Sequence, residues 1–200
     1  MKLKSIGGVL LGAVALIVVA GCALPTLSEV DGAITSTFDA DPDGWQTTED
    51  AVDAPTPAVD LFESSIHATD GGSGIYWYFS APSKFLGSKE SFYGGTLEYE
   101  LKMRTSDVSS SHSEPEVQLE GTNGVVLELD LGILPNPNDW TRFSADLSTT
   151  ADWTVESTGL AATETQIRAV LADLDALRIC GEYNVGADSA ALWYVRLLPQ

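Results

Sequence analysis

Apolar and polar residues alternate one by one over much of the chain. In the segment 95–103, "GTLEYELKM", the odd-numbered positions from Leu97 to Met103 are apolar and the even-numbered positions between them are charged. This period of two is typical of antiparallel strands that place one face on the core and the other in solvent. The same alternation or a dense apolar run predicts further strands at 75–80, 116–121, 125–131, 140–147, 176–183 and 190–198.

One segment has a different period. In "TETQIRAVLADL", residues 163–174, the apolar positions Ile167, Val170, Leu171 and Leu174 follow the i, i+3, i+4, i+7 spacing of a helix. Thr163, followed three positions later by a glutamine, forms a capping box that predicts where this helix begins. The order of elements therefore predicts an all-β fold of two antiparallel sheets packed face to face, with one short helix closing an end or an edge.

The N-terminal residues predict a targeting signal that precedes the fold. Two lysines in the first four positions are followed by an apolar run of about fifteen residues, shorter than the roughly twenty that span a bilayer. The run ends in "VVAGC", which resembles the lipobox of prokaryotic lipoproteins. This resemblance implies a signal peptide over residues 1–21, acylation of Cys22 as in palmitate-bearing lipoproteins, and an extracytoplasmic place on the cell membrane or outer membrane. The alternative is an ordinary secretory signal with a chance cysteine.

The charge balance of the chain limits which classes of molecule it can bind. Lys and Arg number 10 against 29 Asp and Glu, for a net charge of −19, and removal of the signal would take away two lysines and no acid. Nucleic acid is excluded as a partner because phosphate contacts need clustered basic residues. If Cys22 carries lipid, Cys180 has no partner for a disulfide, and its apolar strand context predicts a buried, inert thiol.

Residues 22–33 lack a sustained period and read as a tether, and residues 34–200 are predicted to form one domain. Within that domain, "YWYFSAPSKFLGSKESFYGGTLEYEL" at 76–101 resembles the central signature of the laminin B domain, also called laminin domain IV (type A). The likeness continues through "EPEVQLEGTNGVVLEL" and "ATETQIRAVLADLDALRICGEY" and covers most of residues 35–198 in family order. It implies a jelly-roll β-sandwich similar to the galactose-binding-like folds, and a non-enzymatic module of a surface or secreted protein.

The last strand departs from that family pattern. Where the family typically has "LDNV", this chain has "LWYV" at 192–195, so Trp193 and Tyr194 replace two polar residues. The glycines of "FLG" and "YGG" read as architectural, because glycine permits tight backbone turns. Lys84 and Lys89, which flank this loop, are expected to remain solvated.

A metal site has one candidate in the sequence. Asp39, Asp41 and Asp43 alternate and are followed by Gly44, which matches the opening of a D-x-D-x-D-G calcium loop. Asp50 stands where such loops carry a bidentate glutamate, and no amphipathic helix flanks the segment, so a true EF-hand is excluded. The alternative interpretation is an acidic turn before a strand.

Ligand recognition has weaker candidates. A glycan site needs a flat aromatic face with polar groups around it, and Trp77, Trp140 and Trp193 are candidate platforms, although aromatic residues in strands more often fill cores. Motifs for catalysis are missing, so the chain is predicted not to be an enzyme.

We therefore expect a membrane-anchored binding or adhesion module for a glycan or protein partner. The alternatives are an accessory domain that supports a carbohydrate-active partner and a purely structural cell-envelope protein.

Overall fold

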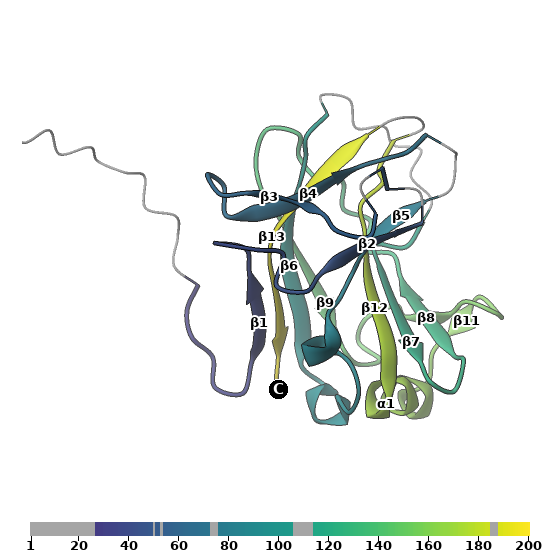
Figure 1. Cartoon of the computed structure of the whole chain (residues 1–200). Coiled ribbons are helices and arrows are strands. Elements are labelled where there is room, and N and C mark those ends of the chain that lie inside the picture. Colours follow the sequence, from purple (N-terminus) through teal and green to yellow (C-terminus); the bar gives the residue numbers. More distant parts are fainter. Residues whose placement is uncertain (1–26, 50, 53, 73–75, 106–113, 185–187) are drawn as a thin grey trace, which may run out of the picture.

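The computed structural model describes residues 27–49, 51–52, 54–72, 76–105, 114–184 and 188–200, and these form a two-layered β-sandwich (Figure 1). The first sheet runs β3-β4-β13-β6-β9, with β1 also paired to β13, and all its pairs are antiparallel. We call it sheet A. Its strands are β1 (Ile34–Thr37), β3 (Ala58–Asp60), β4 (Ser65–Thr69), β6 (Thr96–Met103), β9 (Thr141–Asp146) and β13 (Ser189–Leu198).

The second sheet, called sheet B, is antiparallel in the order β11-β10-β8-β7-β12-β5-β2. Its strands are β2 (Gln46–Glu49), β5 (Trp77–Ser80), β7 (Val117–Gly121), β8 (Val126–Leu129), β10 (Thr154–Val155), β11 (Leu160–Ala161) and β12 (Leu174–Cys180). The prediction of an all-β jelly-roll sandwich of two antiparallel sheets with one helix is confirmed.

Helix α1 (Glu164–Ala172) lies at the end of the sandwich that also holds the C-terminus (Figure 1). The predicted capping box is present, since the Thr163 side chain accepts from the Gln166 backbone while the Gln166 side chain accepts from Thr163. Ile167, Val170 and Leu171 are buried against the core, as their spacing predicted. Leu174, which the pattern assigned to the helix, instead begins β12. Within the described ranges, no helix is long and apolar enough to cross a membrane.

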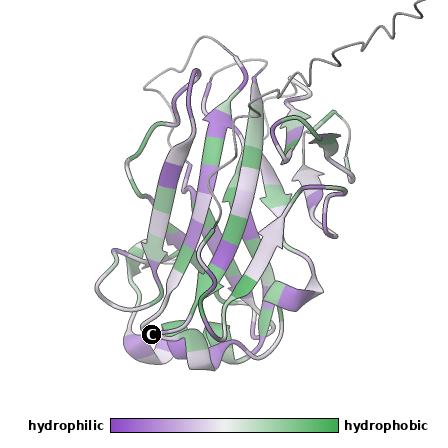
Figure 2. Ribbon diagram, turned by 90° about the vertical axis from the view of Figure 1, so that its left-hand side faces the viewer, coloured by the Kyte–Doolittle hydropathy of each residue, from purple (hydrophilic) through white to green (hydrophobic). Residues whose placement is uncertain are grey.

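Aromatic residues fill the space between the sheets. Tyr99 on β6 stacks on Phe143 of β9 at 4.8 Å between ring centroids, and Trp77 meets Phe79 edge-on at 5.1 Å. Gly181 lies so close to the Trp77 ring that an added Cβ would come within 2.2 Å of it. The alternation of apolar and hydrophilic bands along the strands of sheet A is visible in Figure 2, where that sheet faces the viewer. The apolar members of this alternation point inward, and the polar members make up the outer face of sheet A.

The "KFLGSKESFYGG" loop is architectural, as its glycines predicted. It forms two 3-10 turns, η1 (Ser83–Phe85) and η2 (Glu90–Phe92), whose phenylalanines Phe85 and Phe92 are buried. Gly94 has φ +84, and at Gly95 an added Cβ would come within 2.1 Å of the Leu198 carbonyl oxygen. The expectation that Lys89 stays solvated is wrong: it is 8 % exposed and its ammonium donates to the Leu86 carbonyl.

A candidate ligand-binding face on sheet A

A β-bulge in β13 places two aromatic side chains on the outer face of sheet A. Leu192 pairs with Leu101 of β6, whereas Tyr194 pairs with Glu100, so Trp193 is an extra residue in the ladder. Without the bulge, strict alternation would turn Tyr194 toward the core. With it, Trp193 and Tyr194 both lie on the outer side, and their rings meet edge-on at 5.1 Å between centroids. Bulges re-aim side chains in this way.

The bulge also marks a change of neighbour along β13. On one side of it Leu192 pairs with Ile66 of β4, and on the other side Tyr194 pairs with Thr37 of β1. Trp193 therefore lies at the junction of two partner strands that occupy the same flank of β13.

Trp140, which directly precedes β9, completes an aromatic platform with Trp193. Their ring centroids are 6.2 Å apart with the ring planes inclined at 37°, and both side chains are partly exposed. The backbone N–H of Trp140 is held by the Asp139 carboxylate at 2.9 Å. The Lys102 ammonium lies 4.7 Å from the Trp140 ring centroid, in cation–π range. We call Trp140 and Trp193 the platform.

Beside the platform lies a buried ionic network centred on Glu98 of β6. This carboxylate is 4 % exposed and accepts hydrogen bonds from the guanidinium groups of Arg142 and Arg196 and from the Tyr194 hydroxyl at 3.4 Å. Burial alone would raise the pKa of Glu98, but the hydrogen bonds from Arg196 and Arg142 outweigh it and lower that pKa. Glu98 is therefore an ionised acceptor that fixes both arginines on this face.

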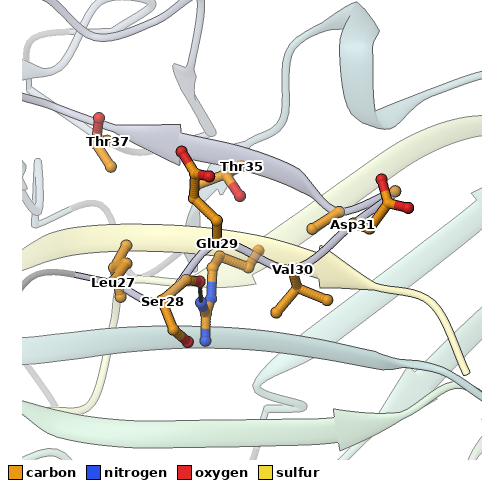
Figure 3. A pocket seen from close by; sticks show the side chains of 10 residues that line it. Leu27, Ser28, Glu29, Val30, Asp31, Thr35 and Thr37 are labelled. Carbon is orange, nitrogen blue, oxygen red and sulfur yellow. Dashed lines mark hydrogen bonds between the residues drawn. The ribbon is translucent and has the colours of Figure 1, made fainter.

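A hollow of about 690 Å³ lies on the same face, between the segment 27–33 and the strands β1 and β13 (Figure 3). Most of its lining comes from residues 27–33, the end of the predicted tether, which rests over β1 and β13. Arg196 donates to the Ser28 carbonyl oxygen at 3.0 Å and so ties this segment to the sheet. The hollow has no aromatic wall, and its charged lining is Glu29, Asp31 and Arg196. It lacks the flat apolar surface that a sugar ring needs.

A further hollow, of about 350 Å³, lies on the outer face of sheet B between Tyr76, Tyr78 and Arg178. Arg178 is paired with Glu120 at 2.9 Å. Tyr78 is only 7 % exposed, and the lining holds no tryptophan. The platform on sheet A is therefore the better candidate for binding.

The predicted platform residues have different positions in the fold. Trp77 is fully buried, and its indole N–H donates to Asp188 at 3.3 Å between the sheets, so it offers no face to a ligand. The prediction of Trp77 as a platform residue is therefore wrong. Trp77 and Phe79 are alternate residues of β5, so they lie on the same face of the strand, and that face packs on the core. Trp140 and Trp193, 53 positions apart in the chain, are brought together.

The three aspartates of the predicted calcium loop lie in a turn between β1 and β2. Asp41 accepts from the Asp43 backbone N–H at 2.6 Å, and the Asp43 carboxylate pairs with the Lys84 ammonium, which also donates to the Thr35 carbonyl at 2.7 Å. No group of three or more His, Cys, Asp or Glu within the described residues is placed to hold a metal ion. Asp41 thus makes a turn contact and Asp43 an ion pair. Asp50 lies outside the described residues.

Of the two cysteines, Cys180 lies within the described residues. Cys180 ends β12 and is fully buried, as predicted, and burial raises the pKa of its thiol well above the ordinary value. Cys22 lies outside the described residues.

Sequence reasoning missed Tyr194, Glu98, Arg142 and Arg196 as parts of this face. Glu98 and Arg196 sit at outward positions of their alternating strands, but their pairing across β6 and β13 is not a local signal. The signal that could have pointed to Tyr194 is "LWYV", where two large aromatics follow each other in a strand.

Comparison with known proteins places this fold in a family. The profile of Laminin B (Domain IV) matches residues 78–198. A curated relative, the basement membrane-specific heparan sulfate proteoglycan core protein of Mus musculus, is 32 % identical over 142 residues, which is 70 % of this chain. The chain spans only 4 % of the length of the curated relatives it matches.

Two solved structures share the fold. The L4b domain of human laminin alpha-2 has a TM-score of 0.63 at 16 % identity, over 74 % of this chain and 86 % of that one. An exo-beta-agarase structure has a TM-score of 0.53 at 10 % identity, over 81 % of this chain and 24 % of that one. The expected resemblance is confirmed, and the chain belongs to the Laminin B (Domain IV) family.

Proposed function

We propose that this protein is a non-enzymatic, lipid-anchored module that binds a glycan through the outer face of sheet A. The observation that carries the proposal is the platform, in which Trp140 and Trp193 lie 6.2 Å apart and partly exposed. Sugar rings present flat C–H faces that pack on indole rings, and their hydroxyl groups need polar partners at the edge of that contact.

Both requirements are met by neighbouring side chains. The platform supplies the apolar surface, and the Lys102 ammonium, which lies over the Trp140 ring at 4.7 Å from its centroid, supplies a donor beside the Trp193 ring. The Glu98 network holds Arg142 on the same face with 60 % of its side chain exposed, so it retains donors for a ligand. Keeping two indole rings at the solvent side of a strand sacrifices hydrophobic burial, and a ligand that covers them would recover it.

The test is a glycan-array screen of the full chain in detergent, read in calcium and again in EDTA, with Trp193→Ala as the decisive variant. We expect binding that persists in EDTA and is lost in Trp193→Ala. Leu160→Ala, which removes an exposed apolar side chain from sheet B, serves as the matched control and should bind normally. Absence of binding to any glycan, or equal binding by Trp193→Ala, would refute the proposal.

Anchoring is the second part of the proposal and rests on the "VVAGC" segment. Acylation of Cys22 would leave only a short stretch between the lipid and the segment 27–33 that Arg196 holds on sheet A. Metabolic labelling with a palmitate analogue tests it: the full chain should be labelled and Cys22→Ala should not. Equal labelling of both would exclude this anchor without bearing on glycan binding.

A further inference from the structure

A hollow of about 330 Å³ adjoins the platform on the outer face of sheet A. It lies between the β3–β4 turn and the end of β6, and Phe62, Met103 and Pro137 are among the residues that line it. Lys102 belongs to both places, because its side chain lines the hollow while its ammonium lies over the Trp140 ring. Its volume falls at the lower end of the range for small-molecule sites, about 300 to 1,000 Å³.

The β3–β4 turn that walls the hollow is braced by the side chain of Asp60. The Asp60 carboxylate accepts from the backbone N–H groups of Phe62 at 3.0 Å and Glu63 at 3.2 Å. Ser64 adopts φ +49, a left-handed conformation that closes the turn. Phe62 at its tip is 92 % exposed, so a large aromatic ring stands in solvent at the rim of the hollow. An aromatic side chain in that position offers a ligand a second apolar surface.

The charges around the hollow balance one another. Arg104 pairs with Asp60 at 3.2 Å, and Lys102 pairs with Glu63. Further along the face, Arg142 and Arg196 both pair with Glu98. Each of the two cations in the hollow has a carboxylate of its own, whereas Arg142 and Arg196 share one, and the chain as a whole carries −19. A polyanionic ligand would therefore meet no uncompensated positive charge in the hollow and would be repelled by the field of the acidic chain.

We propose that this hollow is a second subsite, which holds the neighbouring unit of an uncharged glycan chain whose adjoining unit stacks on the platform. The inference rests on the proposed glycan function and specifies its ligand class. The paired ions give the subsite donors on Lys102 and Arg104 and acceptors on Asp60 and Glu63, and charged partners make the stronger hydrogen bonds to neutral hydroxyl groups. Phe62 covers the unit from the solvent side.

The experiment first uses affinity electrophoresis of the full chain in detergent. The gels contain neutral polysaccharides (a β-glucan, a galactan, a xylan and a mannan) or the polyanions polygalacturonate and heparin. We expect at least one neutral polymer to retard the protein, about equally at low salt and in about 0.5 M NaCl, and neither polyanion to do so. Calorimetry with the monosaccharide and the oligosaccharides of the retarding polymer then measures how affinity rises with chain length.

Phe62→Ala should lower the affinity for the oligosaccharide by a factor of about five or more and leave the affinity for the monosaccharide unchanged. Most of the rise in affinity with chain length would then be lost. Leu61→Ala, which removes another large, exposed apolar side chain from the same turn, is the matched control. Arg104→Gln, which removes one ion pair of the hollow, should reduce the same rise. Thermal unfolding of each variant checks that the fold is intact.

The outcomes separate the two proposals. If Trp193→Ala abolishes binding while Phe62→Ala and Arg104→Gln behave like Leu61→Ala, the second subsite is refuted and the proposed function stands. If a polyanion retards the protein and added salt releases it, the uncharged ligand class is refuted while glycan binding stands. If no polysaccharide retards the protein and the array is also negative, both proposals are refuted.

Discussion

Glu116 carries the most direct test of the electrostatics of this fold. It directly precedes β7, is 2 % exposed, and its carboxylate accepts a hydrogen bond from the Leu131 backbone N–H at 2.6 Å. Its own carbonyl accepts from the Cys180 N–H at 3.0 Å, which fixes the backbone beside β12. Burial raises the pKa of Glu116 from 4.5 to about 7, against the opposing effect of the Leu131 hydrogen bond.

This shift has a defined sign in the free energy of unfolding. Between pH 4.5 and about 7 the folded chain keeps the Glu116 proton that the unfolded chain has released, so the folded state loses stability as the pH rises through that interval. The contribution is full below pH 4.5 and is lost above about pH 7. The difference between the two pKa values corresponds to a change in the free energy of unfolding on the order of 3 kcal/mol, at about 1.4 kcal/mol per pH unit.

Glu116→Gln separates this effect from every other titration. Glutamine keeps the size of the side chain and a carbonyl oxygen for the Leu131 N–H, but it has no proton to lose. Both proteins are unfolded in urea at a series of pH values. The free energy of unfolding of the variant, measured relative to that of the native chain, should rise by about 3 kcal/mol between pH 4.5 and 7.5. Glu90→Gln, at an exposed position, controls for the loss of one carboxylate from an acidic chain. A difference between Glu116→Gln and the native chain that does not change with pH would refute the reasoning.

Three further substitutions test the packing, each by chemical denaturation at neutral pH. Gly181→Ala should destabilise the fold by about 3 kcal/mol, because its Cβ would come within 2.2 Å of the Trp77 ring, and a loss below about 0.5 kcal/mol would contradict that contact. Thr163→Ala should cost about 1 kcal/mol by removing the helix cap, whereas Thr165→Ala in the same helix should cost less if the capping box is the cause. Glu98→Ala should cost about 3 kcal/mol because it leaves Arg196 buried and unpaired; an unchanged stability would show that the network is not structural.

The elements of the fold were predictable where the pattern is local. The alternation in 95–103 corresponds to β6, and the capping box at Thr163 marks where α1 begins, because both signals depend only on residues a few positions apart. The helix end was less predictable. Leu174 continues the helical spacing, yet it is the first residue of β12. Its backbone exchanges hydrogen bonds with that of Gly87, which lies in a loop 87 positions earlier in the chain. A distant partner therefore overrides the local period there.

The candidate site was predictable only in part, and Trp193 shows why. Sequence pattern identifies the tryptophans but assigns their sides by counting alternate positions, and that count holds only while the ladder is regular. Trp77 sits in a regular strand and points inward with Phe79. In β13 the bulge shifts the count by one residue at Trp193, and the neighbour strand changes from β4 to β1 at the same place.

That coincidence gives the departure from the family pattern a structural meaning. In "LWYV" the aromatic pair replaces the polar pair at the point where β13 changes partners, so two large side chains occupy a junction that has no continuous strand beside it. Had the ladder been regular, Tyr194 would have pointed into the core in place of Val195, and its hydroxyl would have needed a buried partner. The bulge turns it outward to the Glu98 carboxylate instead. The same irregularity that local patterns cannot foresee thus builds the face on which binding is proposed.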